Sequence, residues 1–246
     1  MYFVCIMRPK DTMSIYNTTV FMPSEFTLIG IPGLESVQCW IGIPFCAMYL
    51  MAMTGNSLLL IILILIIIKS EHSLHQPMYI FLGVLGVTDI VLSTRIVPKM
   101  LGIFWFHVTE IYFDSCLLQM WLIHTFQCTE SGILLAMALD RYVAICYPLR
   151  HAAIFTPHLI SQRASAVTLR AALLVAPCLV LIKFRLQFYH KTVVSHSYCE
   201  HMAIVKLAAE NIRVNKIYGM FVAFNITVFD PTFITLSYMQ IFITVF

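Results

Sequence analysis

The sequence predicts an all-α membrane protein whose chain crosses a bilayer several times. Of its 246 residues, 60% are hydrophobic and 11% are charged, whereas about a quarter of the residues in a soluble domain are charged. Residues 40–68 hold no charged side chain, and about 20 mostly apolar residues make one helical crossing. Residues 58–68 are apolar on every face, where a soluble helix would keep a polar stripe. These observations exclude a soluble enzyme.

Five spans of membrane-crossing length are expected. The first is the uncharged run described above. The second follows a short polar loop and starts at Pro77, which suits the first turn of a helix, so the first two spans form an antiparallel hairpin. The third runs inward from Cys116. The fourth contains Arg170 and Pro177, and proline is tolerated in a membrane helix where neighbours satisfy the freed carbonyl. The fifth is the apolar carboxyl-terminal stretch. The ranges are about 40–68, 77–100, 115–139, 165–183 and 216–246.

We expect residues 1–39 to lie outside the cell and the protein to reside in the plasma membrane. Asn17-Thr18-Thr19 is a glycosylation sequon in this polar segment, and Cys116 and Cys199 fall in the same compartment. Lysines and arginines occur in the loops on both sides, so they do not decide the orientation. The second sequon, at residues 225–227, lies inside the fifth span and is a chance match. The first apolar run, residues 1–7, is too short for a cleavable signal peptide.

Four ionisable residues fall inside the expected spans, where each costs about 2.5–3.5 kcal/mol near the membrane centre unless it faces water or a partner. They are Asp89, Glu130, Arg170 and Asp230. Asp89 and Glu130 lie deep in neighbouring spans, and two nearby carboxylates repel unless one is protonated or a cation lies between them. Two interpretations stay open: two separately hydrogen-bonded acids, or one shared polar or sodium-type site.

Residues 137–150 read Met-Ala-Leu-Asp-Arg-Tyr-Val-Ala-Ile-Cys-Tyr-Pro-Leu-Arg. Asp140 beside Arg141 could be a charged helix end at the membrane interface. The whole run, however, resembles the Asp-Arg-Tyr signature of rhodopsin-like G-protein-coupled receptors, in the extended form found in olfactory receptors. Further segments between Phe26 and Phe246 resemble class I (fish-like) olfactory receptors, whereas the residues before Met13 look like an extension. These segments are 30–35, 55–56, 74–79, 98–101, 195–199, 218–219 and 237–238.

The resemblance implies a rhodopsin-like helical bundle with five of its seven helices present in residues 40–246. It also implies a receptor that binds a small volatile odorant and couples to a heterotrimeric G protein of the olfactory type, with no cofactor and no enzymatic activity. Asp140 would hold Arg141 until activation, when Tyr238 would meet Arg141. Tyr142 completes the signature. Such a buried pair, released by helix movement, is a bistable element. Membrane lipid is the other expected partner, and the scattered net charge of +3 does not indicate nucleic acid.

The family pattern also implies a disulfide between Cys116 and Cys199 that holds a lid over the pocket. Class I receptors often carry a second cysteine pair around that loop, and the corresponding positions here are Tyr189 and Ala209. His124 matches a pocket histidine of the class, although a lone membrane histidine can also be a packing residue. The other expected ligand contacts are Met120, Ile123, Gln127, Cys128, Glu200 and His201. His196, Cys199 and His201 lack a fourth ligand, so no metal site is predicted.

The sequence ends at Phe246, and nothing in it matches a sixth or seventh span. Outward movement of the sixth span accompanies activation in such receptors, so we expect that this chain does not signal alone. The alternative is a non-signalling membrane fragment that associates with full-length receptors or misroutes them. A transporter or channel is a third hypothesis, but no inverted repeat supports it.

Overall fold

The computed structural model describes residues 19–69, 77–148 and 157–245. The chain divides into two compact units. One, the disulfide unit, contains Met1–Met51, Ser93–Ile123 and Ala176–Gly219. The other, the helical unit, contains Ala52–Leu92, His124–Val175 and Met220–Phe246.

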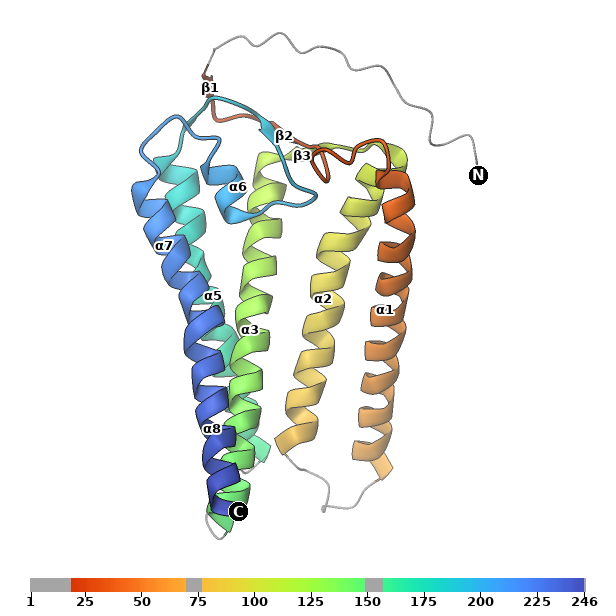
Figure 1. Cartoon of the computed structure of the whole chain (residues 1–246), viewed down its shortest axis with the longest axis vertical. Coiled ribbons are helices and arrows are strands. Elements are labelled where there is room, and N and C mark those ends of the chain that lie inside the picture. The colour runs from red at the N-terminus through yellow and green to blue at the C-terminus, as the bar shows by residue number, and fades with distance from the viewer. Residues whose placement is uncertain (1–18, 70–76, 149–156, 246) are drawn as a thin grey trace. The chain divides into compact units, whose positions relative to one another are not determined.

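Five helical segments are long and apolar enough to cross a membrane, which confirms the predicted number of spans. They are α1 (Gln38–Lys69), α2 (Pro77–Phe106), α3 (Phe113–Cys146), α5 (Pro157–Arg185) and the run formed by α7 (Arg213–Phe224), η1 (Asn225–Phe229) and α8 (Asp230–Val245), as Figure 1 shows. Most are longer than predicted, because the helices continue beyond their apolar parts. The fourth begins at Pro157 and not near residue 165, and proline is favourable at a first helical turn.

Hydroxyl side chains inside these helices bond to the carbonyl oxygen four residues earlier. Thr88 donates to Val84 at 2.7 Å, and Ser237 donates to Phe233 at 2.8 Å. A hydroxyl group in an apolar environment is costly unless it is hydrogen-bonded. The preceding turn of the same helix therefore satisfies these polar groups without a partner from another helix.

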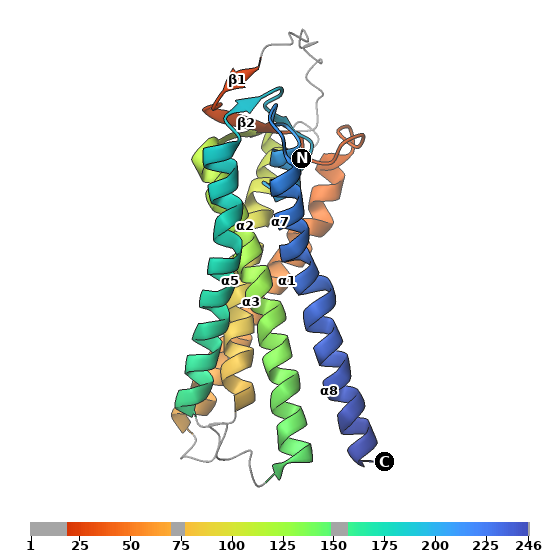
Figure 2. The same ribbon diagram turned by 90° about the vertical axis from the view of Figure 1, so that its left-hand side faces the viewer.

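A π-helical turn, η1, interrupts the last span, which the sequence predicted as one uninterrupted helix. Pro231 has no N–H group, and its ring would clash with the carbonyl four residues earlier in a regular α-helix. The wider turn relieves this clash, and the Asp230 N–H donates to the Asn225 carbonyl five residues back. The helical run still continues from α7 to α8 (Figure 2).

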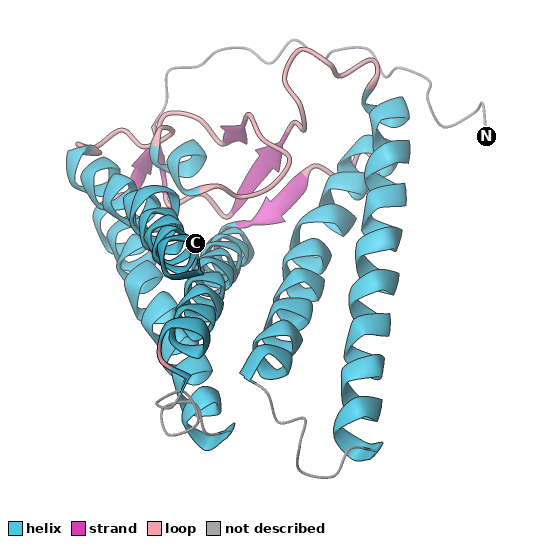
Figure 3. Ribbon diagram, turned by 60° about the horizontal axis from the view of Figure 1, so that its bottom comes forward, coloured by secondary structure: helices cyan, strands magenta, loops and turns pink. Residues whose placement is uncertain are grey.

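The disulfide unit also contains short strands, which the sequence analysis did not predict (Figure 3). β2 (Glu25–Leu28) lies between β3 (Glu110–Tyr112), to which it is antiparallel, and β5 (Val193–Val194), to which it is parallel. β1 (Val20–Phe21) pairs with β4 (Phe188–Tyr189). The amino-terminal segment is therefore tied by backbone hydrogen bonds to the loop that follows α5.

Each unit has its own apolar core. In the disulfide unit, Tyr189 and Phe26 are fully buried, and their ring centroids lie 5.7 Å apart. Phe113 completes this aromatic cluster at 6.1 Å from Tyr189. In the helical unit, Phe81 of α2 packs with Ile133 of α3 and Ile160 of α5. These clusters fix the helices on which the candidate site residues lie.

Candidate functional site

Cys116 at the start of α3 and Cys199 in the loop before α6 (His201–Val205) form a disulfide, with their Cα atoms 5.5 Å apart. Both cysteines are fully buried, and the pairing implied by the family resemblance is confirmed. Because Cys199 is oxidised, its sulfur is not a metal ligand. Within the described ranges, no three side chains of His, Cys, Asp or Glu gather as a metal site requires. Cys39 is also disulfide-bonded, which the sequence analysis did not predict.

Gln119 links the same loop to two helices, a role that the sequence analysis missed. Its Nε2 donates to the carbonyl of Arg95 on α2 at 2.7 Å. Its Oε1 accepts from the backbone N–H of Cys199 at 3.2 Å. Because the side chain is buried, both bonds form away from water, where an unpaired polar group is costly. The loop before α6 is therefore held by one covalent bond and one side-chain bridge.

α6 positions His201, one of the predicted ligand contacts. The carboxylate of Glu200 caps the helix by accepting from the N–H of Ala203 at 2.8 Å. His201 is buried, and its ring lies against the backbone of α7 at Gly219. A Cβ atom at Gly219 would come within 2.7 Å of His201 Cε1, closer than real contacts allow. Glycine is therefore required at position 219 for the imidazole to occupy this place.

Asn215 lies one turn of α7 before Gly219 and is 0% exposed. Neither its amide nitrogen nor its amide oxygen has a hydrogen-bond partner within the described part of the chain. Such a group in a native protein calls for an explanation, usually a water or a ligand. Asn215 was not among the predicted ligand contacts. Residues 215, 219 and 222 recur at helical spacing on one face, and Val222 is also buried.

The predicted ligand contacts are divided between the two units. Met120, Ile123, Glu200 and His201 belong to the disulfide unit, where Met120 and Ile123 are buried. His124, Gln127 and Cys128 belong to the helical unit. In that unit His124 is half-buried, Cys128 is buried, and Gln127 is exposed. Their common role in ligand binding stays a prediction.

The two positions that correspond to the second cysteine pair of class I receptors lie side by side. Tyr189 pairs with Ala208 in an isolated bridge, and the N–H of Ala209 donates to the carbonyl of Phe188 at 2.7 Å. Burial raises the pKa of Tyr189, and the negative charge of Glu210 raises it further. Backbone pairing and a buried aromatic ring therefore connect the two segments at this place.

Burial raises the pKa of Tyr198, and the negative charge of the nearby Glu200 raises it further.

In the helical unit, Asp89 of α2 and Glu130 of α3 lie close enough for their charges to interact. Both side chains are half-buried. Their proximity is what a shared polar or sodium-type site requires, and that site stays a prediction.

One residue after Glu130 on α3, the Oγ of Ser131 donates to Oδ2 of the buried Asp230 at 2.7 Å.

The signature residues lie near the end of α3. Asp140 is buried, and the guanidinium of Arg141 donates to the sulfur of Met78 on α2. Tyr142 packs edge-on against Tyr147, with ring centroids 5.8 Å apart. The hydroxyl of Thr244 and the thiol of Cys146 lie 3.4 Å apart and join α8 to the end of α3.

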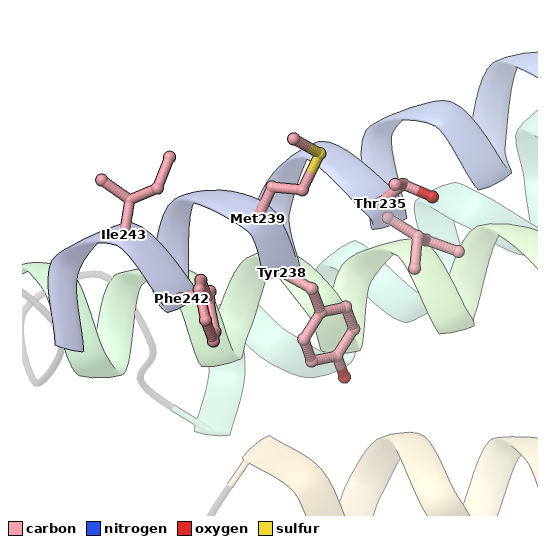
Figure 4. A pocket seen from close by; sticks show the side chains of 6 residues that line it. Thr235, Tyr238, Met239, Phe242 and Ile243 are labelled. Carbon is pink, nitrogen blue, oxygen red and sulfur yellow. The ribbon is translucent and has the colours of Figure 1, made fainter. Parts of the chain in front are cut away.

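Tyr238, which the resemblance assigns to activation, is exposed on α8. With Met239, Phe242 and Ile243 it lines an open apolar groove along this helix (Figure 4). The predicted glycosylation site, Asn17, lies outside the described residues.

Comparisons with known proteins point to one family. The model of the olfactory receptor family matches residues 45–246. The chain is 76% identical to olfactory receptor 52A1 of Homo sapiens, over 95% of this chain and 73% of that receptor. It is 70% identical to human olfactory receptor 52A5, over 95% of this chain and 72% of that receptor. Human olfactory receptor 52A4 is 64% identical, over 95% of this chain and 75% of the receptor.

Proposed function

This chain belongs to the olfactory receptor family, and from that premise we propose that it binds a small volatile ligand beside His201 and Asn215, in the manner of odorant receptors that couple to a G protein of the olfactory type. That this chain does not signal alone stays a prediction. Olfactory receptors are multi-pass, rhodopsin-like G-protein-coupled receptors that detect odorants, and they are not enzymes. The finer parts of the proposal concern which residues contact the ligand and which chemical groups they recognise.

The observation that carries the ligand proposal is the fully buried amide of Asn215, whose donor and acceptor both lack a partner within the described ranges. An asparagine amide offers N–H groups and a carbonyl oxygen. It suits an alcohol or an amide, which both accept and donate, and its N–H groups alone can donate to a carboxylate. The buried Met120, Ile123 and Ile204 of the same unit supply apolar surface. Ligand sites typically combine such surface with a few polar groups.

The remaining site residues belong to the proposal as predictions. That His124, Gln127, Cys128 and Glu200 also contact a ligand stays a prediction, as does the position of Asn17 and the amino terminus outside the cell. Asp140, Arg141, Tyr142 and Tyr238 serve G-protein coupling. The electrostatic proximity of Asp89 and Glu130 supports a cation between them, because opposite charge offsets the repulsion of two carboxylates.

The test is cyclic-AMP output from cells that express this chain with an olfactory G protein, exposed to short fatty acids, alcohols and other small volatiles. Surface labelling gives the amount of receptor, and thermal stabilisation of the purified chain reports binding separately from signalling. Stabilisation by a probe that His201→Ala reduces supports the ligand proposal, whereas a cyclic-AMP response of the chain at equal surface level would contradict the expectation that it does not signal alone. If surface-exposed chain shows neither a cyclic-AMP rise nor stabilisation by any probe, the ligand-binding proposal is wrong.

A second candidate function is association with full-length receptors in the membrane, which would alter their trafficking. The observation that favours it is the apolar groove along α8, whose side chains Tyr238, Met239, Phe242 and Ile243 are open to a neighbouring helix. Coexpression with a tagged full-length receptor tests this function. Capture of the receptor by the chain, lost when Met239 and Ile243 are both changed to tryptophan, would support it, whereas unchanged receptor surface level and no capture would exclude it.

A further inference from the structure

A small cavity lies inside the helical unit where α3, α5 and the π-turn come together. Most of its wall is apolar, but three polar side chains line it: Arg170 of α5, Asn225 of η1 and Asp230 of α8. All three lie within segments that are apolar enough to cross a membrane. The cavity therefore brings a cation, an anion and an amide together in the part of the chain where polar groups are most costly.

Asp230 has one carboxylate oxygen satisfied and one available. The residue is 5% exposed. Its Oδ2 accepts from Ser131 at 2.7 Å, whereas its Oδ1 has no hydrogen-bond partner within the described part of the chain. Because a buried anion without full hydrogen bonding is strongly destabilising, this oxygen calls for a donor inside the cavity.

Arg170 is the cation that lines the same cavity. Its guanidinium carries five N–H donors and no acceptor. An arginine within a membrane span requires a counter-charge or water. Arg170 is exposed on one side of α5, and Asp230 is the only carboxylate among the residues that line this cavity. Asp230 is therefore the counter-charge that the cavity offers to Arg170.

The π-turn adds the third polar group. The backbone N–H of Asp230 donates to the carbonyl of Asn225, which fixes these two residues on adjacent turns. The Asn225 amide nitrogen donates to the carbonyl of Phe221 at 2.8 Å. This leaves the amide oxygen of Asn225 as an acceptor beside the cavity. Single π-turns inside α-helices are frequent at functional sites.

The cavity is large enough for one water molecule. It leaves ≈ 20 Å³ for the centre of a water molecule, and about 10–15 Å³ of such space holds one water, which needs two to four polar partners. We propose that this cavity binds one ordered water that bridges the Asp230 carboxylate to the Arg170 guanidinium, and that this water-mediated ion pair ties α8 to α3 and α5 within the membrane. Asn225 accepts the remaining hydrogen of the water.

The water is tested on the wild-type chain in lipid nanodiscs by X-ray radiolysis, which generates hydroxyl radicals from bound water. Cys128 lines the cavity and is 8% exposed, whereas Cys178 is 3% exposed and lies away from it. We expect Cys128 to be oxidised at least several-fold faster than Cys178, and Asp230→Leu to remove the difference. Equal, slow oxidation of both thiols in the wild-type chain would show a dry cavity and overturn the proposal.

The ion pair is tested by a double-mutant cycle with Arg170→Met and Asp230→Asn, read as thermal stability in nanodiscs. Each single variant leaves one charge without its partner, so each should unfold at a lower temperature, and the double variant should lose much less than the sum of the two. Arg185→Met, at the exposed end of the same helix, is the control and should change little. Additive losses in the cycle would mean that the two charges are not coupled and would contradict the proposal.

Discussion

The imidazole of His201 lies against the backbone of Gly219, where an added Cβ atom would be 2.7 Å from Cε1 and 2.8 Å from Nδ1. The position of this histidine therefore depends on the absence of a side chain on α7. Because the disulfide at Cys199 and the cap at Glu200 fix the start of α6, the ring has little freedom to move away.

Gly219→Ala should displace His201 and weaken binding of a polar ligand about tenfold, which is about 1.4 kcal/mol. The measurement is ligand-dependent thermal stabilisation. Gly102→Ala is the matched control, because a Cβ atom there meets nothing within 4 Å. That change should be neutral or stabilise α2 by roughly 0.5–1 kcal/mol. Equal ligand responses in the two variants would show that Gly219 does not position the histidine.

Tyr189→Ala should destabilise the chain by about 3–5 kcal/mol, because it removes a fully buried aromatic ring from the cluster with Phe26 and Phe113. Tyr189→Phe should cost little, since the tyrosine hydroxyl has no hydrogen-bond partner within the described residues. Thermal unfolding of the purified chain compares the two. A large loss in the phenylalanine variant would mean that the hydroxyl has a partner.

Alkaline pH should destabilise the wild-type chain through Tyr189. Burial raises the pKa of this tyrosine in the folded state, so folding favours its neutral form. The resulting stability is fully present below the ordinary tyrosine pKa of about 10 and falls as pH rises above it. The unfolding temperature, followed from pH 8 to 11, should therefore fall less steeply in Tyr189→Phe than in the wild-type chain. If the unfolding temperature fell equally steeply with pH in both proteins, ionisation of Tyr189 would not be the cause of the alkaline destabilisation.

Replacing Cys116 and Cys199 together by serine should lower stability by about 2–5 kcal/mol, because their disulfide closes a loop with a sequence separation of 83 residues. The bridge formed by Gln119 remains, so part of the loop should keep its place. Because Cys39 is also disulfide-bonded, reduction is compared in Cys39→Ser, where it should reproduce the loss. The variant that carries serine at all three positions should be insensitive to reductant, and a further loss on its reduction would contradict this explanation.

The five spans could be predicted from the sequence because each depends on composition alone over a long stretch. Residues 58–68 are apolar on every face, and no tertiary detail changes that conclusion. The π-turn could not be predicted, because Pro231 is compatible with a kink, a break or a wider turn. The strands are two to four residues long and pair segments far apart in the chain, such as Val20 with Tyr189.

The candidate site was predicted in part. The Cys116–Cys199 pairing followed from the family pattern. His201 was expected as a ligand contact from the loop, whereas it is the first residue of α6, and its contact with a ligand stays a prediction. Asn215 was missed because its importance depends on full burial without a partner, which no local pattern reveals. Arg170 and Asp230 were both predicted to lie inside spans. That they line one cavity could not be predicted, because it depends on how three helices pack.

The most direct test of the account compares octanoic acid, 1-octanol and octane as stabilisers of the purified chain in lipid nanodiscs. The three probes share their carbon number and differ in the head group that Asn215 and His201 would recognise. We expect the acid and the alcohol to raise the unfolding temperature of the wild-type chain more than octane does, and Asn215→Leu to abolish that advantage. If octane stabilises the wild-type chain as well as the polar probes do, or if Asn215→Leu changes nothing, the proposed ligand site is wrong.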